Sequence, residues 1–567
     1  MVAIAGRERC LLIRSLSSEL NEVGVKALYH LISFFRILRT KFSHIKTLLH
    51  KRRPSQFRQF INILQSPQET EGEYMNQLCK RYLCWDTDLI EKSESIQFLA
   101  HKPERKNIAF VADEGWEGYY SYASVVKVAD GYRVYTRTHP RRIKLSYRGT
   151  ASANVLRDNY APPEWEEAVA LLESRDGITF TKPILNQFEY FGTTENNIVY
   201  HREGEIDNFS VFYDENPNCP ENERFKALSA YYVNHYPYLQ YYISADGYNF
   251  EFVRDLPLQG VFDSYQTIVW DKETEQYFVY YRHYHTPDGE DAPVISTRSD
   301  LIRDIRVATT KDFINFEDHG QIAFEQGEQP YHLYTNQIMK YFRDDSTFIG
   351  FPARYNDRVD DMENFADMPN YNYRRNVREE YGRVGTVETD CIVMTSRDGF
   401  TFRTHDEAFV TPGPEARGNW WYGDCYSVYG MALTPSDIKG ADDEISMYFP
   451  EKEKREYRRY TIRQDGFFSW FGPYKGGSLL TKPVEIVGDQ MVINFASSSL
   501  GAVTIALCDE NGEIIEGYET GRMFGDKVDR PVRFKKSISE LCGRKVRLKI
   551  DLKDAHLYSF AFLKSQS

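Results

Sequence analysis

The heptapeptide Ser174-Arg-Asp-Gly-Ile-Thr-Phe180 is the first of five related segments in this chain. The other four are Ser244-Ala-Asp-Gly-Tyr-Asn-Phe250, Thr310-Lys-Asp-Phe-Ile-Asn-Phe316, Ser396-Arg-Asp-Gly-Phe-Thr-Phe402 and a weaker copy, Arg463-Gln-Asp-Gly-Phe-Phe-Ser469. An aspartate accepts hydrogen bonds from backbone N–H groups two residues on, a glycine adopts positive φ, and an aromatic side chain anchors the returning strand. Each segment is therefore predicted to be a structural hairpin turn.

The spacing of these turns indicates the architecture. Their first residues lie 70, 66, 86 and 67 residues apart. A run that is typical of a β-strand comes before each turn, at Ala168–Glu173, Tyr238–Ile243, Ile305–Thr309, Cys391–Thr395 and Tyr457–Ile462. A period of this length, with several short strands per copy, is typical of four-stranded sheets repeated around an axis. The five copies predict an all-β fold, a five-bladed β-propeller.

The composition of the 567 residues agrees with this fold class. Aromatic residues make up 15% of the chain, with 41 Tyr and 36 Phe, and aromatic side chains favour β-sheet. The 35 Gly and 23 Pro are too few for collagen or for a disordered chain. The formal net charge of −13 argues against nucleic acid as the main partner, because phosphate binding requires a cationic surface.

The first sixty residues have the opposite charge balance. They contain twelve Lys or Arg against three acids, and apolar residues recur at helical spacing between Val23 and Leu49. We interpret residues 1–74 as a basic, partly helical or disordered leader, with weak contact to a membrane surface as an alternative. The longest uncharged run, Ala27–Phe35, is too short to span a bilayer, and no signal-peptide pattern follows it. A cytoplasmic location is therefore expected.

The chain changes again after Gly476-Gly477. Short alternating apolar runs and turns over 476–567 predict a small antiparallel β-sandwich of about ninety residues. The propeller is assigned to residues 75–475, with residues 79–105 as a lead-in strand before the first blade.

Several segments resemble one superfamily of propeller enzymes. They are Phe191-Gly-Thr-Thr-Glu-Asn-Asn-Ile198, Phe212-Tyr-Asp-Glu-Asn-Pro217, Val261-Phe-Asp-Ser264, Leu333-Tyr-Thr-Asn336 and Ile349-Gly-Phe-Pro-Ala-Arg354. Together with the repeated turns, they make residues 105–475 similar to the five-bladed glycoside hydrolases of families 43 and 32, and to a bacterial branch with a C-terminal β-sandwich. The resemblance implies a glycosidase without an organic cofactor. It carries no catalytic assignment for that branch.

Cleavage of a glycosidic bond requires two carboxyl groups facing the sugar. In the resembling enzymes these acids lie in the central funnel, near the beginnings of the innermost strands. Asp263 is the first candidate, because it is a lone carboxylate between Phe262 and the apolar run Thr267–Trp270. Glu117 is the candidate base or nucleophile and Glu328 the candidate acid. A turn-capping role for Asp263, and solvated or hydrogen-bonded loop roles for the two glutamates, are the alternatives.

Substrate-binding candidates surround these acids in the sequence. Arginine guanidinium groups hold sugar hydroxyls or a uronate or sialate carboxylate, whereas an ion pair with a nearby aspartate is the alternative. Asparagine and histidine hydrogen-bond to hydroxyls, and tryptophan stacks on sugar faces. The candidates are Arg137, Arg282, Arg354, Asn197, His332, Asn336 and Trp116. No metal site is predicted, although a Ca²⁺ ion in the funnel is left open.

Three other functions are compatible with these patterns. The first is a propeller that binds a glycan or protein without catalysis. The second is a sialidase-like enzyme, which the adjacent Asp-Gly pairs argue against, because sialidase repeats separate these two residues. The third is a glycoside phosphorylase, which an Arg/His cluster in the funnel would indicate.

Overall fold

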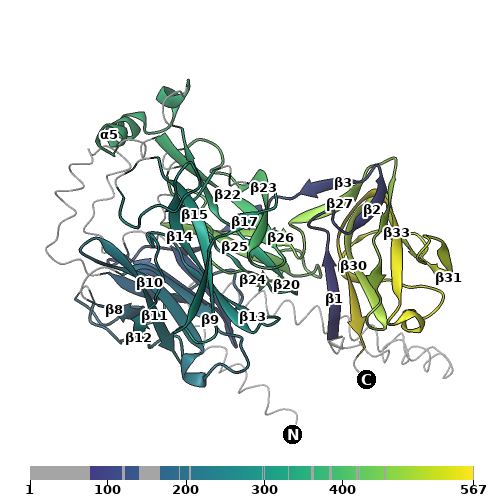
Figure 1. The fold of residues 1–567 in the computed structure, drawn as a ribbon, viewed down its shortest axis with the longest axis horizontal. Helices are drawn as coiled ribbons and strands as arrows, with labels where there is room; N and C mark the ends of the chain where they lie inside the picture. Colours follow the sequence, from purple (N-terminus) through teal and green to yellow (C-terminus); the bar gives the residue numbers. More distant parts are fainter. Residues whose placement is uncertain are drawn as a thin grey trace, which may run out of the picture. The chain divides into compact units, whose positions relative to one another are not determined.

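The computed structural model describes residues 77–117, 122–138, 167–190, 192–202, 206–296, 298, 300–327, 329, 331–358, 363–381, 386–416, 419–420, 422–451 and 455–565. These residues belong to one compact unit, Asn76–Ser565. They fold mainly into β-strands (Figure 1). The predicted basic leader, residues 1–74, lies outside the described residues. No helix within these ranges is long and apolar enough to cross a bilayer.

Four sheets each contain four antiparallel strands. The first sheet consists of β5 (Ala123–Val128), β6 (Gly131–Thr138), β7 (Ala168–Ser174) and β8 (Ile198–His201). The second consists of β9 (Asp207–Tyr213), β10 (Phe225–Val233), β11 (Tyr236–Ser244) and β12 (Glu251–Asp255). The third consists of β13 (Thr267–Asp271), β14 (Gln276–His285), β15 (Ile302–Thr310) and β16 (Phe316–Gln321). The fifth consists of β24 (Ala432–Thr434), β25 (Glu444–Glu451), β26 (Glu456–Arg463) and β4 (Glu104–Val111).

The fourth sheet differs from these, because it has seven strands. They are β17 (Ala323–Phe324), β18 (His332–Leu333), β19 (Met339–Tyr341), β20 (Asp344–Gly350), β21 (Ala353–Asp357), β22 (Val387–Ser396) and β23 (Thr401–Val410). The α-helix α5 (Tyr371–Tyr381) lies between β21 and β22 in the sequence.

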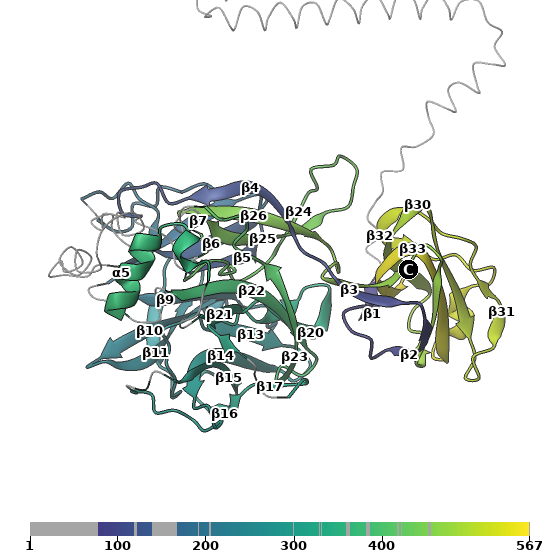
Figure 2. The same cartoon turned by 90° about the horizontal axis from the view of Figure 1, so that it is seen from above.

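One strand of each of these five sheets contacts a strand of a neighbouring sheet, in a propeller-like order. β24 contacts β5, β5 contacts β9, β9 contacts β13, and β13 contacts β19. The fifth sheet is completed by β4, which precedes the first sheet in the sequence and pairs with β26 (Figure 2). Because an early strand closes a late sheet, the two ends of this part of the chain are held together by backbone hydrogen bonds.

The repeated turns also connect neighbouring sheets. Three turn glycines accept a hydrogen bond from a tyrosine of another sheet: Tyr448 to the Gly177 carbonyl at 2.5 Å, Tyr135 to Gly247 at 2.9 Å and Tyr280 to Gly399 at 2.9 Å. In the copy without glycine, Phe313 stacks on Tyr241 with ring centres 4.4 Å apart. Four of the five predicted turn aspartates behave as expected, because each accepts from the backbone N–H two residues on: Asp176, Asp246, Asp312 and Asp398. The fifth, Asp465, bonds to side chains instead, and the strand after it, β27 (Phe468–Gly472), pairs with β3 (Gln97–Ala100) and β33 (Lys545–Lys564).

The predicted count of five like blades is not confirmed. Four sheets have the expected four strands, whereas the turn at Ser396–Phe402 joins two strands of the seven-stranded sheet. The 86-residue interval before this turn is the longest of the four. Its extra length forms additional strands and α5, which explains the difference from a regular blade.

The predicted C-terminal β-sandwich is not confirmed. The strands from β27 onward pair with β1, β2 and β3 in a ten-stranded sheet. Its strands are β1 (Gln77–Leu83), β2 (Ile90–Glu94), β3 (Gln97–Ala100), β27 (Phe468–Gly472), β28 (Gly477–Thr481), β29 (Val484–Glu485), β30 (Gln490–Cys508), β31 (Ile514–Glu519), β32 (Asp526–Pro531) and β33 (Lys545–Lys564). The pairing of β30 with β33 is irregular at Asn494/Phe495 and Ser497/Ala502. Such irregularities bend long strands, so that one hydrogen-bonded sheet can enclose a core.

The segment expected to lead into the first blade divides between two sheets. β1, β2 and β3 pair with C-terminal strands, while β4 joins the fifth sheet. Trp85 is buried among residues of the fourth and fifth sheets, including Tyr341 at 4.7 Å between ring centres. Residues 77–111 therefore contribute strands both to the ten-stranded sheet and to the fifth sheet.

Candidate functional site

Five tyrosines gather where the inner strands begin, and we call them the tyrosine cluster. Tyr122 precedes β5, Tyr334 lies between β18 and β19, and Tyr355 belongs to β21. Tyr422 and Tyr426 come before β24. These residues come from three sheets and meet only through tertiary folding.

Four rings of the cluster are stacked, whereas Tyr422 packs edge-on against three of them. Tyr426 is stacked with Tyr122 at 5.5 Å and with Tyr334 at 5.4 Å between ring centres, and Tyr334 is stacked with Tyr355 at 5.9 Å. The hydroxyl oxygens of Tyr334 and Tyr422 are 2.5 Å apart. Stacked and hydrogen-bonded rings have few alternative rotamers. The tyrosine cluster therefore forms a surface of fixed side chains.

Two arginines of the third sheet lie against the tyrosine cluster. The guanidinium carbon of Arg282 is 5.0 Å from the ring centre of Tyr334, and that of Arg303 is 5.5 Å from the same point. Arg303 is also 4.0 Å from the ring centre of Tyr355. The electron-rich faces of aromatic rings stabilise such cations where water is excluded.

Asp263 is the carboxylate beside these arginines. Its Oδ2 lies 3.4 Å from Nη2 of Arg282; the side chain of Asp263 is 62% exposed and that of Arg282 only 2%. The loop is anchored on both sides of Asp263, because Phe262 is fully buried and the Ser264 hydroxyl donates to the backbone carbonyl of Tyr334 at 2.6 Å. The structure therefore brings the predicted Asp263 and Arg282 together at the edge of the tyrosine cluster.

Burial keeps the hydroxyls of Tyr122, Tyr334 and Tyr422 protonated at neutral pH, because it raises their pKa. Burial, followed by the negative charge of Asp263, raises the pKa of Tyr334. Burial is also the main cause that raises the pKa of Tyr122 and Tyr422. The phenols can therefore donate hydrogen bonds, while Asp263 offers the exposed acceptor.

Glu117 lies in a different environment. It is fully buried and accepts from the backbone N–H groups of Asp113 and Glu114 at 3.1 Å each. Lys182 donates to the same carboxylate at 2.5 Å. Such contacts stabilise the loop that contains Glu117, in line with the hydrogen-bonded alternative considered from the sequence.

Trp116 and Asn197 are partners of each other. The indole N–H of Trp116 donates to Asn197 Oδ1 at 3.1 Å, and Asn197 Nδ2 donates to the Leu171 carbonyl at 2.9 Å. Asn336 is similarly occupied, because its Oδ1 accepts from the Thr267 hydroxyl at 2.9 Å and its Nδ2 donates to the Tyr265 carbonyl at 2.8 Å. These amide groups connect strands and loops.

The other two predicted arginines form ion pairs. Arg137 donates to Glu167 at 2.8 Å. Arg354 makes a two-pronged contact with Asp390, at 2.9 and 2.6 Å. The hydrogen bonds to Asp390 are the largest cause that raises the pKa of Arg354. Only Arg282 among the three predicted arginines is shown beside Asp263.

His332 lies next to the arginine pair. Its Nδ1 accepts a hydrogen bond of 3.2 Å from the backbone N–H of Arg303. Its ring centre is 5.6 Å from that of Tyr355. The structure thus places His332 with Arg282 and Arg303 along one side of the tyrosine cluster.

The remaining predictions concern Glu328 and a cation. Glu328 lies outside the described residues. Within the residues that the structure describes, no group of three or more His, Cys, Asp or Glu side chains is arranged to hold a metal ion.

Arg303 and the tyrosine cluster were not predicted from the sequence. Arg303 is directly opposite Tyr284 in the pairing of β14 with β15, and Tyr284 is two residues from Arg282. Cross-strand partners and alternate residues share one face of a sheet, so all three side chains point the same way. The sequences of β14 and β15 contain these residues, but which of them face each other can be predicted only when the pairing register of the two strands is known.

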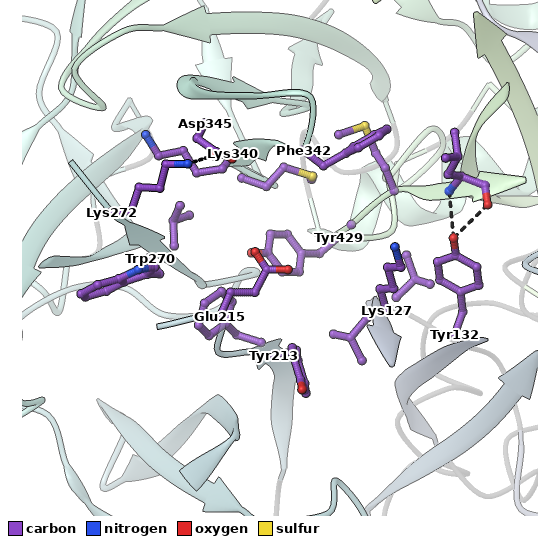
Figure 3. Close-up of a pocket in the computed structure, with 18 of the residues that line it drawn as sticks. Lys127, Tyr132, Tyr213, Glu215, Trp270, Lys272, Lys340, Phe342, Asp345 and Tyr429 are labelled. Atoms are coloured by element: carbon purple, nitrogen blue, oxygen red, sulfur yellow. Dashed lines mark hydrogen bonds and ion pairs between the residues drawn. The ribbon is translucent and has the colours of Figure 1, made fainter. Parts of the chain in front are cut away.

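A cavity lies where β5, β9, β13 and β19 end, at the opposite ends of these strands from the tyrosine cluster. Its volume is about 640 Å³, and its lining includes Lys127, Glu215, Trp270, Lys340 and Tyr429 (Figure 3). Lys340 pairs with Asp271 at 2.6 Å. None of the residues predicted as catalytic or substrate-binding lines this cavity.

No family model matches the chain, and no curated protein matches it. Several solved structures are similar to it at low identity. An N-acetylgalactosamine deacetylase from F. plautii in complex with blood group B trisaccharide is 12% identical, covering 80% of this chain and 95% of that one, with a TM-score of 0.37. A glycosyl hydrolase from Bacteroides ovatus is 11% identical, covering 64% and 94%, with a TM-score of 0.38. A structure from the GH130 family of mannoside phosphorylases, which contains glycoside hydrolases that target β-1,2 mannosidic linkages in Candida mannan, is 10% identical, covering 64% and 94%, with a TM-score of 0.38.

Proposed function

We propose that this protein is a carbohydrate-active enzyme that cleaves a glycosidic bond, with Asp263 in the catalytic site. The observation that carries the proposal is the contact between the exposed Asp263 carboxylate and the buried Arg282, above the packed tyrosine cluster. An exposed carboxylate held beside a buried arginine is suited to proton transfer or nucleophilic attack at a bound sugar.

The architecture that supports this site is proposed to be a ring of five wedges. The seven-stranded sheet would take the place of the fourth blade, because β19 contacts β13 and the turn glycine Gly399 accepts from Tyr280 of the third sheet. The tyrosine cluster would then lie around the axis, where the funnel is expected. The proposed domains are the leader 1–74, the propeller 75–475 and the C-terminal module 476–567, with β1–β3 and β27 contributed by the propeller segment to the C-terminal sheet.

The second carboxyl group required for hydrolysis is proposed to be Glu328. It immediately precedes Gln329, whose side-chain amide donates to the backbone carbonyl of Arg303 at 2.7 Å. We prefer it to Glu117, whose carboxylate is engaged by Lys182. In this scheme one of the two residues protonates the leaving oxygen, and the other attacks the sugar or activates water.

The experiment compares the full-length protein with Asp263→Asn on a panel of aryl glycosides and oligosaccharides. Asp130→Asn is the matched control, since Asp130 is an exposed aspartate in the turn after β5 and the change in charge is the same. We expect Asp263→Asn to reduce kcat/KM by about a hundredfold or more with the fold intact, and the control to retain activity. Wild-type kcat/KM in Asp263→Asn would remove Asp263 from the mechanism.

A glycoside phosphorylase is a second candidate function. The observation that favours it is the grouping of Arg282, Arg303 and His332, because phosphate is held by such donors. In that reaction, inorganic phosphate replaces water as the group that receives the glycosyl unit. Cleavage that depends on added phosphate and releases a sugar phosphate would establish this candidate over hydrolysis.

A further inference from the structure

The two buried arginines of the site have few acidic partners. Arg282 is 2% exposed and Arg303 is 9% exposed, so both cations are largely removed from water. The ion pair shown for Arg282 is the 3.4 Å contact with the exposed Asp263. Among the described residues, no carboxylate forms an ion pair with Arg303. The described residues therefore provide these two cations with one exposed carboxylate, which contacts Arg282.

Several N–H groups of these arginines also lack a hydrogen-bond partner. Arg282 Nε donates to the Val261 carbonyl at 3.2 Å, but the buried Nη1 and Nη2 atoms have no hydrogen-bond partner, and neither has Nε of Arg303. Arg303 Nη1 makes only a 3.5 Å contact with His332 Nδ1. Buried charged groups are normally paired and hydrogen-bonded, because the loss of hydration is otherwise not offset.

The two arginines are arranged to act on one ligand. Tyr284 faces Arg303 across the strand pair and lies two residues from Arg282, so the three side chains share one face of the third sheet. Both guanidinium carbons lie over the Tyr284 ring, at 5.2 and 5.6 Å from its centre, and over the Tyr334 ring. The two cations are therefore held close together despite their mutual repulsion.

We propose that Arg282 and Arg303 together bind an oxyanion, either the carboxylate of an acidic sugar or inorganic phosphate. The two ligands share the same chemistry, because planar guanidinium groups donate paired hydrogen bonds to carboxylate and phosphate oxygens. In this proposal the exposed side chain of Asp263 turns away from Arg282 when the anion binds. The inference rests on the proposed function, because it places the anion in the site assigned to the glycan.

The test measures binding and turnover separately in the full chain. Binding is measured by calorimetry with digalacturonate and N-acetylneuraminate, each compared with its uncharged methyl ester, and with inorganic phosphate. Arg303→Gln removes one guanidinium group, and Arg303→Lys keeps the charge without the planar fork. Arg298→Gln is the matched control, because Arg298 is an exposed arginine near the start of β15 that pairs with Asp300.

We expect the wild type to bind an acid about tenfold or more tightly than its ester, or to bind phosphate. Arg303→Gln should lose this preference, Arg303→Lys should retain part of it, and Arg298→Gln should match the wild type. Preference for an acidic sugar identifies the carboxylate, whereas binding of phosphate with phosphate-dependent turnover identifies the second source.

Equal binding of each acid and its ester, together with no phosphate binding, would overturn the proposal, and this wild-type comparison holds even if Arg303→Gln fails to fold. The same measurements distinguish a failure of the proposed function. Anion binding without turnover of any glycan would support the oxyanion site and contradict the proposed enzyme activity. Turnover of neutral glycans without anion binding would support the enzyme activity and contradict the oxyanion site.

Discussion

Arg81 Nη1 donates a hydrogen bond of 3.0 Å to Oδ2 of Asp465, and both residues are buried. Arg81 belongs to β1, whereas Asp465 is the aspartate of the fifth repeated turn. Asp465 also accepts from Arg343 Nε at 2.9 Å and from the Tyr341 hydroxyl at 2.6 Å. The same sequence motif that caps exposed turns elsewhere thus ties the ten-stranded sheet to the fourth and fifth sheets.

Replacing Asp465 with Asn is expected to destabilise the protein strongly. It removes the buried carboxylate of Arg81 and Arg343, which keep only the partly exposed Asp529 as an ion-pair partner. The loss of a buried partner costs about 3–5 kcal/mol of unfolding free energy. The measurement is urea unfolding, with Asp176→Asn as control, since Asp176 is the exposed aspartate of the first turn. Equal losses for both variants would contradict the junction role.

The same aspartate predicts a pH dependence. Burial opposes its ionisation, but Arg343 and Arg81 hold the pKa of Asp465 below its ordinary value. Because the folded-state pKa is lowered, this stabilisation is present above the unfolded-state pKa of about 4 and is lost as the pH falls below it. The difference in unfolding free energy between wild type and Asp465→Asn should therefore shrink as the pH falls from about 6 towards 3. A difference that stays constant over this range would contradict it.

Gly247→Ala is expected to disturb the contact between the first and second sheets. The φ of Gly247 is +74°, and an added Cβ would lie 2.4 Å from the hydroxyl oxygen of Tyr135. Left-handed backbone and overpacking together cost about 2–4 kcal/mol. Gly289→Ala controls for the backbone alone, because its φ is +82° and no atom lies within 4 Å of the added Cβ. A thermal scan in which both variants lose the same Tm would show that the contact contributes nothing.

Asp312 should show the pKa of a turn aspartate. Hydrogen bonds from the backbone N–H groups of Asn315 and Ile314 lower the pKa of Asp312 to about 2. The folded-state value is again the lower one, so its contribution to stability is present above about pH 4 and is lost towards pH 2. NMR titration of the aspartate carboxyl carbons checks this, with the Asp312→Asn spectrum assigning the signal. Titration of that signal near pH 4 would contradict the turn geometry.

Arg354→Gln separates ion pairing from substrate binding. The two hydrogen bonds from Arg354 to Asp390 predict a loss of about 1–3 kcal/mol of stability, with little change in KM once an active substrate is known. Urea unfolding and steady-state kinetics measure the two effects. A large rise in KM with unchanged stability would instead indicate that Arg354 binds substrate.

The sequence could predict the hairpin turns and the strands before them. Asp176, Asp246 and Asp398 bond to backbone groups two and three residues away, so each turn is encoded within its own seven residues. The predicted runs correspond to β7, β11, β15, β22 and β26. The seven-stranded sheet was not predicted, because strand pairing over a long interval depends on distant partners.

The candidate site could be predicted only in part. Asp263 and Arg282 were selected from strand position and residue type, and the structure places them in contact. Arg137 and Arg354 had the same sequence signal but pair with Glu167 and Asp390. Which arginine has a carboxylate partner is decided by residues far away in the chain.

The amino-acid sequence by itself determined the all-β character and the repeated turns, because Asp-Gly hydrogen bonding and aromatic strand patterns act over a few residues. Only the tertiary structure decided that Asp465 becomes a buried junction, and that Arg303 and the tyrosine cluster meet beside Asp263. These groups come from separate sheets, and their burial and charge balance arise only when the sheets pack together.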